Sequence, residues 1–239
     1  MLSRLRKLGI VLAVIGLLFA AGGAYAFLKT QDGYRSLNAF SAAQNVTLNY
    51  NDQGQLVDGG ETAGAVAIMS LLTNDWAFPV VAGELDPNDP VVNTGSEYMY
   101  QMATVAYHTL HGTQTVVLPE DVTAADGTVY KAGTYDFPVD GRYWTAFDRT
   151  NPIEAKAREQ AWTGTVHGLI GELGVGTVTA STLQMGLAMA GLFAGIGLVF
   201  MLTGGGLIWA GKGNKVVVPD TVPEAFHPEP VVDTDLIKV

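Results

Sequence analysis

Two long apolar runs without charged residues lie near the two ends of the chain. The first, Leu8–Leu28, has 21 residues, and the second has 39 residues between Glu172 and Lys212. A membrane hydrocarbon core about 30 Å thick needs roughly 20 helical residues. Each run is therefore long enough for one transmembrane helix, and we place these helices at 8–28 and 185–211. Buried helices of soluble proteins rarely lack charge over such a length, which disfavours that alternative.

The first apolar run also has features of a secretory signal peptide. Arg4, Arg6 and Lys7 form a basic segment before it, and Ala24-Tyr-Ala26 matches the small-x-small pattern of a cleavage site. The apolar run continues past this motif to Leu28, which favours an uncleaved membrane anchor. A cleaved signal peptide is the alternative interpretation.

Basic residues near the two runs predict the orientation in the membrane. Five lysines and arginines flank the runs on the side of the chain termini, whereas only Lys29 and Arg35 flank them on the other side. Cytoplasmic flanks of spans carry the excess of such residues. We therefore expect 1–7 and 212–239 to be cytoplasmic, and 29–184 to be an extracytoplasmic domain on the cell membrane.

Charge and composition exclude several classes of protein. The formal net charge is −10, with 13 basic and 23 acidic residues, which excludes a basic nucleic-acid-binding protein. The chain has no cysteine, which excludes a disulfide scaffold, a thiolate zinc site and a cysteine nucleophile. The range 29–184 alone carries 18 acidic and 7 basic residues. The segment Val216–Val239 is acidic and contains four prolines, which predicts a flexible or extended tail.

The apolar pattern within 29–184 predicts a mostly helical α+β domain with one or two small β-hairpins. Helical spacing of apolar residues and the helix start at Asn151-Pro152-Ile-Glu154, where Asn151 is a capping residue, are the main signals. The expected helices are 29–45 as a continuation of the first span, 61–73, 95–110, and 151–173 leading into the second span with a kink at Gly174 or Gly176. The expected strands are Val46–Tyr50 and Gln55–Asp58 around a turn at Asn51–Gly54, Thr113–Leu118, and a stretch around Val129–Phe137.

Small residues recur at helical spacing in both predicted spans. Gly16 and Ala20 form a small-xxx-small pair in the first span, and Gly191 and Gly195 form a GxxxG motif in the second. Such residues let helix backbones approach closely in lipid. We expect these faces to pack against another helix, either within this chain, in a second copy, or in a different protein. Neither span contains an ionisable residue, which disfavours a carrier or a proton pump.

One group of polar residues on the predicted helix 95–110 is a candidate metal site. Glu97, Gln101, Thr104, His108 and His111 recur at steps of three and four residues. His108 and His111 have a spacing that can place two imidazoles on one metal ion. The third ligand would then be His167, which lies on the last extracytoplasmic helix. The alternative is a solvated helix face with ordinary histidines.

Aromatic and basic residues cluster in Gly141–Arg149, which reads GRYWTAFDR. One interpretation is a binding patch, because tryptophan, tyrosine and arginine are common at interface hot spots. The other is a piece of core with a local ion pair. The chain contains no Walker, GxSxG or dinucleotide-binding motif.

Several stretches resemble a family of small two-span membrane proteins from actinobacteria. They are Ser36-Leu-Asn-Ala-Phe, Ala67-Ile-Met-Ser-Leu-Leu-Thr, Ser96-Glu-Tyr-Met-Tyr-Gln-Met-Ala-Thr, Tyr107-His-Thr-Leu-His-Gly-Thr-Gln and Asp140-Gly-Arg-Tyr-Trp. The resemblance implies a topology rather than an activity. Such sequences often carry the label of an aromatic ring-opening dioxygenase, a class that holds Fe(II) with two histidines and a carboxylate. Here that set would be His108, His111 and Glu97, but three turns of a straight helix separate Glu97 from His108.

These observations favour a non-catalytic integral membrane protein without a cofactor. We expect it to be a structural or accessory subunit of a cell-envelope complex, such as a respiratory or transport assembly or a homo-oligomer. Its partners would be the lipid bilayer and other membrane subunits or further copies of itself. The alternative function is an extracytoplasmic ligand- or metal-binding protein that uses the His108/His111 helix face.

Overall fold

The computed structural model describes residues 2–212, so the predicted tail Val216–Val239 lies outside the described residues. The chain divides into two compact units. One comprises the described parts of Met1–Leu17 and Leu198–Val239, and the other is Leu18–Gly197. The second unit holds every element between the two long helices.

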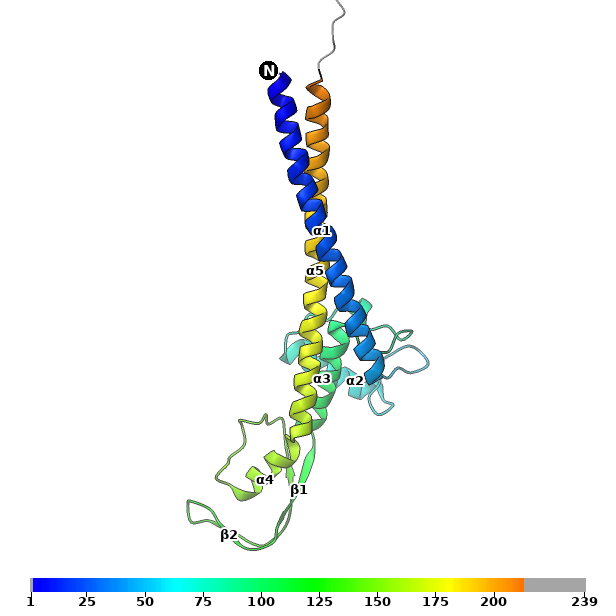
Figure 1. Ribbon diagram of the computed structural model, residues 1–239. Helices are drawn as coiled ribbons and strands as arrows, with labels where there is room; N and C mark the ends of the chain where they lie inside the picture. The colour runs from blue at the N-terminus through cyan, green and yellow to red at the C-terminus, as the bar shows by residue number, and fades with distance from the viewer. Residues whose placement is uncertain (1, 213–239) are drawn as a thin grey trace, which may run out of the picture. The chain divides into compact units, whose positions relative to one another are not determined.

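The described chain is mostly helical and contains two small antiparallel sheets (Figure 1). This agrees with the helical domain and small hairpins that the sequence predicts. A short π-helical turn, Leu71–Asp75, follows the second helix, and a 3-10 turn covers Ala82–Glu84. The helices are α1 (Leu2–Gln44), α2 (Thr62–Ser70), α3 (Gly95–Leu110), α4 (Pro152–Ala161) and α5 (Gly164–Ala210), and the strands are β1 (Thr113–Leu118), β2 (Val122–Thr123), β3 (Val129–Tyr130) and β4 (Gly133–Pro138).

The two predicted apolar runs lie within the two longest helices, α1 and α5. Both helices are long and apolar enough to cross a membrane, and only 11% of the most apolar stretch of each is buried. The core helix of a soluble protein would bury most of such a stretch. The predicted continuation of the first helix beyond Lys29 is confirmed, because α1 runs to Gln44 and ends where Asn45 adopts a φ of 52°.

The predicted helix 95–110 is confirmed as α3, and its start has a physical cause. The Thr94 hydroxyl accepts a hydrogen bond from the Glu97 backbone N–H at 3.4 Å. The Glu97 carboxylate in turn accepts from the Thr94 and Asn93 N–H groups, each at 2.9 Å. This capping box satisfies N–H groups that have no partner inside the helix.

The predicted helix 151–173 is wrong, because it is two helices. Asn151 caps α4 as expected, but α4 ends at Ala161 and α5 begins at Gly164. Between them Trp162 leaves the helical conformation, and its indole N–H donates to the Arg142 carbonyl at 3.0 Å. Around Gly174 and Gly176, where a kink is predicted, α5 continues without interruption.

The predicted hairpin of Val46–Tyr50 and Gln55–Asp58 is present in a shortened form, in which the Asn51 N–H donates to the Gln55 carbonyl and the Val57 N–H to the Asn49 carbonyl, each at 2.9 Å. The Asn51 side chain accepts from the N–H groups of Gln53 and Gln55, and a single bridge joins Tyr50 to Leu56. A longer ladder does not form because the preceding residues pair elsewhere. Thr47 forms a bridge with Val91, and the Leu48 N–H donates to the Pro90 carbonyl at 2.8 Å.

The two sheets are nested along the chain. Strand β1 pairs antiparallel with β4, with Thr113 opposite Pro138 and Leu118 opposite Gly133. Strands β2 and β3, which lie between them in sequence, pair with each other. The stretch predicted around Val129–Phe137 therefore contains two strands, β3 and β4, rather than one.

The main core of the second unit combines residues from four helices. Leu37 from α1, Ile68 from α2, Ala103 from α3, and Leu173 and Ala180 from α5 belong to one buried cluster. Figure 1 shows α3 alongside the first half of α5, where these residues lie. A second cluster contains Leu71, Leu110, Val139, Phe147 and Trp162, and a third contains Val116, Leu118 and Ala157.

Candidate functional site

Small residues let α1 and α5 approach closely inside the second unit. A Cβ atom added at Gly23 would lie 2.8 Å from the Ala194 nitrogen and 2.9 Å from the Ala190 oxygen. One added at Gly186 would lie 2.6 Å from the Thr30 hydroxyl oxygen. These contacts are too short for any residue larger than glycine unless the helices move apart. Glycine at these positions therefore sets the separation of the two helices.

The first unit contains the same kind of contact. A Cβ atom added at Gly9 would lie 2.6 Å from the Gly204 carbonyl oxygen, and one added at Gly204 would lie 2.5 Å from the Gly9 oxygen. Close backbone contacts of this kind are typical of helices that associate in lipid.

The predicted packing residues fall into two groups. Gly16 is buried and Ala20 is half-buried, whereas Gly191 and Gly195 are exposed. A Cβ atom added at Gly191 or Gly195 would have no neighbouring atom within 4 Å. Both positions of the GxxxG motif are therefore open, and Gly191 borders a space between α1 and α5 that Gly23 and Ala190 also line.

The polar stripe predicted on α3 is not a uniform solvent-facing surface. Glu97 is only 2% exposed, Gln101 and Thr104 are half-buried, and His108 and His111 are exposed. Burial raises the pKa of Glu97 above its ordinary value, and the hydrogen bonds from Asn93 and Thr94 oppose this effect. The carboxylate of Glu97 is therefore used to cap its own helix.

The three histidines make separate contacts. His108 Nε2 lies 2.9 Å from Asp58 Oδ1, and His111 Nδ1 lies 2.9 Å from the Tyr107 carbonyl oxygen. His167 Nδ1 lies 3.0 Å from the Thr163 carbonyl oxygen. Within residues 2–212, no group of three or more histidine, aspartate or glutamate side chains is placed to hold a metal ion. The structure does not bring these histidines together as one such group.

Tyr100 lies near Asp58, the partner of His108, and Tyr50 lies near Tyr100. Tyr100 is only 3% exposed, and the hydroxyls of Tyr100 and Tyr50 are buried without a hydrogen-bond partner among the described residues. Burial, with a further contribution from the charge of Asp58, raises the pKa of Tyr100 to about 12. Both phenols therefore stay protonated at neutral pH. No sequence pattern marks this cluster, because Asp58 and His108 are distant along the chain.

Replacing His108 by alanine tests the metal interpretation. The His108–Asp58 pair is largely exposed on the histidine side, so its loss should change the free energy of unfolding by less than about 1 kcal/mol. We expect His108→Ala/His111→Ala to have the same metal content as the wild type, measured by elemental analysis of the purified protein. Stoichiometric metal that disappears in the double variant would contradict this expectation and support a metal site.

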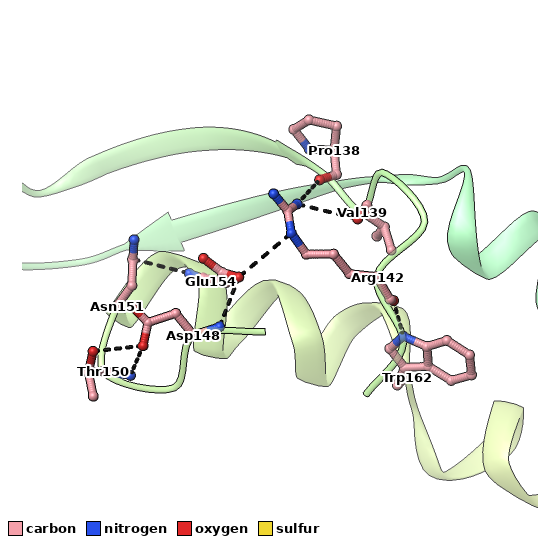
Figure 2. A network of polar contacts seen from close by, with 8 residues as sticks. All are labelled: Pro138, Val139, Arg142, Asp148, Thr150, Asn151, Glu154 and Trp162. Carbon is pink, nitrogen blue, oxygen red and sulfur yellow. Dashed lines mark hydrogen bonds and ion pairs between the residues drawn. The ribbon is translucent and has the colours of Figure 1, made fainter. Parts of the chain in front are cut away.

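The segment 141–149 forms part of a polar network that connects α4 to the β1–β4 sheet through hydrogen bonds and an ion pair. Figure 2 shows the Arg142 side chain between the sheet and α4. Its guanidinium donates to the carbonyls of Pro138 and Val139, at 3.2 and 3.3 Å, and lies 3.9 Å from the Glu154 carboxylate. Glu154 also accepts from the Asp148 N–H at 2.8 Å.

Aromatic residues of the same segment pack beside this network. Phe147 is buried, Tyr143 stacks on Trp162 with ring centroids 5.6 Å apart, and the Arg158 guanidinium lies 4.0 Å above the Trp144 ring. His167 contacts the edge of the Trp144 ring. The contacts agree with the interpretation of this segment as core with a local ion pair.

Comparisons with known proteins returned no matching family model, no matching curated protein and no matching solved structure. The class of protein therefore follows from the molecule itself, which has two long apolar helices joined to a small, mostly helical domain.

Proposed function

We propose that the protein is an integral membrane protein with two spans that serves as a non-catalytic structural or accessory subunit of a larger cell-envelope assembly. The observation that carries this proposal is the exposure of both long apolar helices. Large apolar side chains such as Leu18, Val199 and Leu202 are 67%, 60% and 67% exposed. Water would oppose such exposure, at roughly 25 cal/mol per Å² of apolar surface, whereas lipid or another helix would cover it.

The proposed orientation has both termini in the cytoplasm and the domain of 29–184 outside. Its support is the distribution of basic residues, with Arg4, Arg6 and Lys7 before the first span and Lys212 after the second. An acidic domain outside the membrane is also consistent with this orientation, because acidic residues have little influence on translocation.

The open GxxxG face supports assembly with another helix. The face at Gly191 and Gly195 lies on the part of α5 that we place in the membrane and contacts no atom of this chain near a Cβ position. Within a bilayer such a face favours close packing with a second helix. We propose that this helix belongs to another subunit or to a second copy of the chain.

Native mass spectrometry after extraction from the source membrane in mild detergent tests the proposed assembly. We expect a defined complex whose mass identifies either further copies or other subunits. A bare monomer with a bound metal ion or small molecule would contradict the subunit proposal and favour the alternative, a ligand-binding protein that uses the His108 and His111 face.

The double substitution Gly191→Leu/Gly195→Leu tests the packing face. Both added Cβ atoms have room in the isolated chain, so its stability should be unchanged or slightly higher, but the affinity for the partner helix should fall about tenfold or more. The readout is the fraction of assembled protein in native mass spectrometry. The control is Gly22→Leu, which adds the same side chain at an open position of α1. Equal assembly in both variants would contradict the assignment of this face.

A further inference from the structure

An elongated groove of about 580 Å³ lies between α1 and α5, with α3 at its edge, entirely within the second unit. Gly171 leaves part of its wall without a side chain, whereas Gly33 packs against Leu183 and Gly176 packs against the Tyr98 ring. Phe40 and Val175 contribute apolar walls and are themselves 47% and 67% exposed. The groove is therefore an apolar channel along the helix pair that no part of the described chain fills.

A small recess of about 100 Å³ lies beside the groove, between the same three helices. Phe40, Tyr98 and Glu172 line both spaces, so the two are neighbours. The recess adds the amide side chains of Gln44 and Gln101 to otherwise apolar walls. The Tyr98 hydroxyl already bonds to the Ser41 hydroxyl at 2.8 Å, which leaves the two amides and Glu172 as the polar groups for a ligand.

The position of the groove along α1 relates it to the membrane surface. Gly33 follows Lys29, the first charged residue after the apolar run, by one helical turn, or roughly 6 Å at 1.5 Å per residue. The polar head-group layer of a bilayer is about 5–8 Å thick on each side. In the proposed membrane orientation, only the Gly33 end of the groove lies at the level of the lipid head groups. The groove and the recess extend from there away from the membrane, with Gln44 roughly 16 Å further along α1.

Charge restricts the ligand that fits. Among residues 2–212, Glu172 is the only charged side chain that lines the groove or the recess, and the surrounding range 29–184 has more than twice as many acidic as basic residues. A phosphate head group would meet a like charge here without a basic partner. A hydroxyl head group would instead donate to the Glu172 carboxylate or to an amide oxygen.

We propose that the groove binds an uncharged membrane amphiphile, with its apolar chain along α1 and α5 and its hydroxyl head group at Glu172, Gln101 and Gln44. This inference rests on the proposed membrane location of the two long helices. The size of the recess favours the acyl chain of an amphiphile over a helix of a partner protein. A helix with its side chains is about 10 Å wide and cannot enter a recess of about 100 Å³.

Photolabelling of the full chain in phosphatidylcholine nanodiscs tests the proposal. The probe is a monoacylglycerol with a diazirine in its acyl chain, and labelled peptides are mapped by mass spectrometry. We expect labels in 33–40 and 171–179 in addition to the apolar runs. A lysophosphatidic acid probe with the same chain should label these ranges about tenfold less, and Glu172→Gln should reduce this difference.

Two matched pairs of variants distinguish the effect of blocking the groove from the effect of any substitution on α5. Gly171→Leu fills the groove, whereas Gly168→Leu adds the same side chain one turn earlier, outside it, and neither added Cβ meets an atom within 4 Å. Val175→Asp places a charge in the groove, whereas Val178 is equally exposed, at 67%, and lies outside it. We expect Gly171→Leu and Val175→Asp to lower labelling of 33–40 about tenfold, and Gly168→Leu and Val178→Asp to leave it unchanged.

The other outcomes overturn the proposal in distinguishable ways. Equal labelling in Gly171→Leu and Gly168→Leu, or labels confined to 8–28 and 185–211, would exclude the groove as a lipid site while keeping the membrane location. A chain that does not enter nanodiscs would contradict the membrane location itself. Labelling of the purified chain but not of its native assembly would assign the groove to a neighbouring subunit.

Discussion

Replacing Gly23 by leucine should lower the free energy of unfolding by about 3 kcal/mol. A Cβ atom at this position meets backbone atoms of Ala190 and Ala194, which cannot move without moving α5. Overpacking of this kind typically costs about 1–3 kcal/mol, and here the close backbone contact is lost as well. The measurement is unfolding of the full chain in mild detergent by titration with dodecyl sulfate, followed by helical circular dichroism.

The neighbouring residue supplies the control for this prediction. Gly22→Leu adds the same side chain to α1 where no atom lies within 4 Å of the new Cβ. It should leave the unfolding midpoint unchanged or raise it slightly, because leucine is a better helix former than glycine by roughly 1 kcal/mol. Equal loss of stability in both variants would show that glycine is needed for another reason than the contact between α1 and α5.

Replacing Glu97 by alanine should destabilise the domain between the two long helices by about 3 kcal/mol. The substitution leaves the Asn93 and Thr94 N–H groups without their acceptor at the start of α3, and each unsatisfied buried donor costs about 1–3 kcal/mol. Glu97→Gln retains an oxygen that can accept both hydrogen bonds, so it should preserve most of the stability. The measurement is thermal unfolding of both variants in the same detergent. A loss as large in Glu97→Gln as in Glu97→Ala would contradict the capping explanation.

The same pair of proteins gives a prediction for pH dependence. Burial raises the pKa of Glu97 in the folded state above its ordinary value of 4.5. The raised pKa means that the folded protein favours the neutral carboxyl of Glu97. Its contribution to the free energy of unfolding is therefore complete below the ordinary pKa, and it is lost as the pH rises through the raised pKa of the folded state. Glu97→Gln lacks this titration, so its stability relative to the wild type should increase between about pH 4 and about pH 7. A constant difference over this range would contradict a raised pKa.

Local sequence signals predicted the elements that are controlled by local interactions. The capping residue Asn151 and the first helical residue Pro152 fix the start of α4, and a complete capping box fixes the start of α3. The long uncharged runs likewise predicted parts of two long apolar helices. Where a helix end is fixed by bonds to its own neighbours, the sequence contains the necessary information.

Features fixed by distant contacts were not predictable in this way. The break at Trp162 depends on the Arg142 carbonyl, which the indole reaches only after the chain has folded back. Helical periodicity placed Glu97 on a polar stripe with His108, but the turn before α3 buries Glu97. Similarly, the spacing of small residues marked Gly186, Gly191 and Gly195 alike, but it did not identify Gly23 and could not tell which of these glycines contacts the neighbouring helix.

The composition of the main core constrains how the chain acquires its fold during synthesis. Leu37 comes from the first helix and Ala180 from the last, yet both belong to the same buried cluster as Ile68 and Ala103. Residues from α2 and α3 therefore have an incomplete core while the ribosome is still making α5. Nascent chains with exposed apolar surface are prone to aggregation. The core can be completed only after α5 has been synthesised. A chain truncated before Gly164 would therefore expose the apolar surface that Leu173 and Ala180 cover in the full chain.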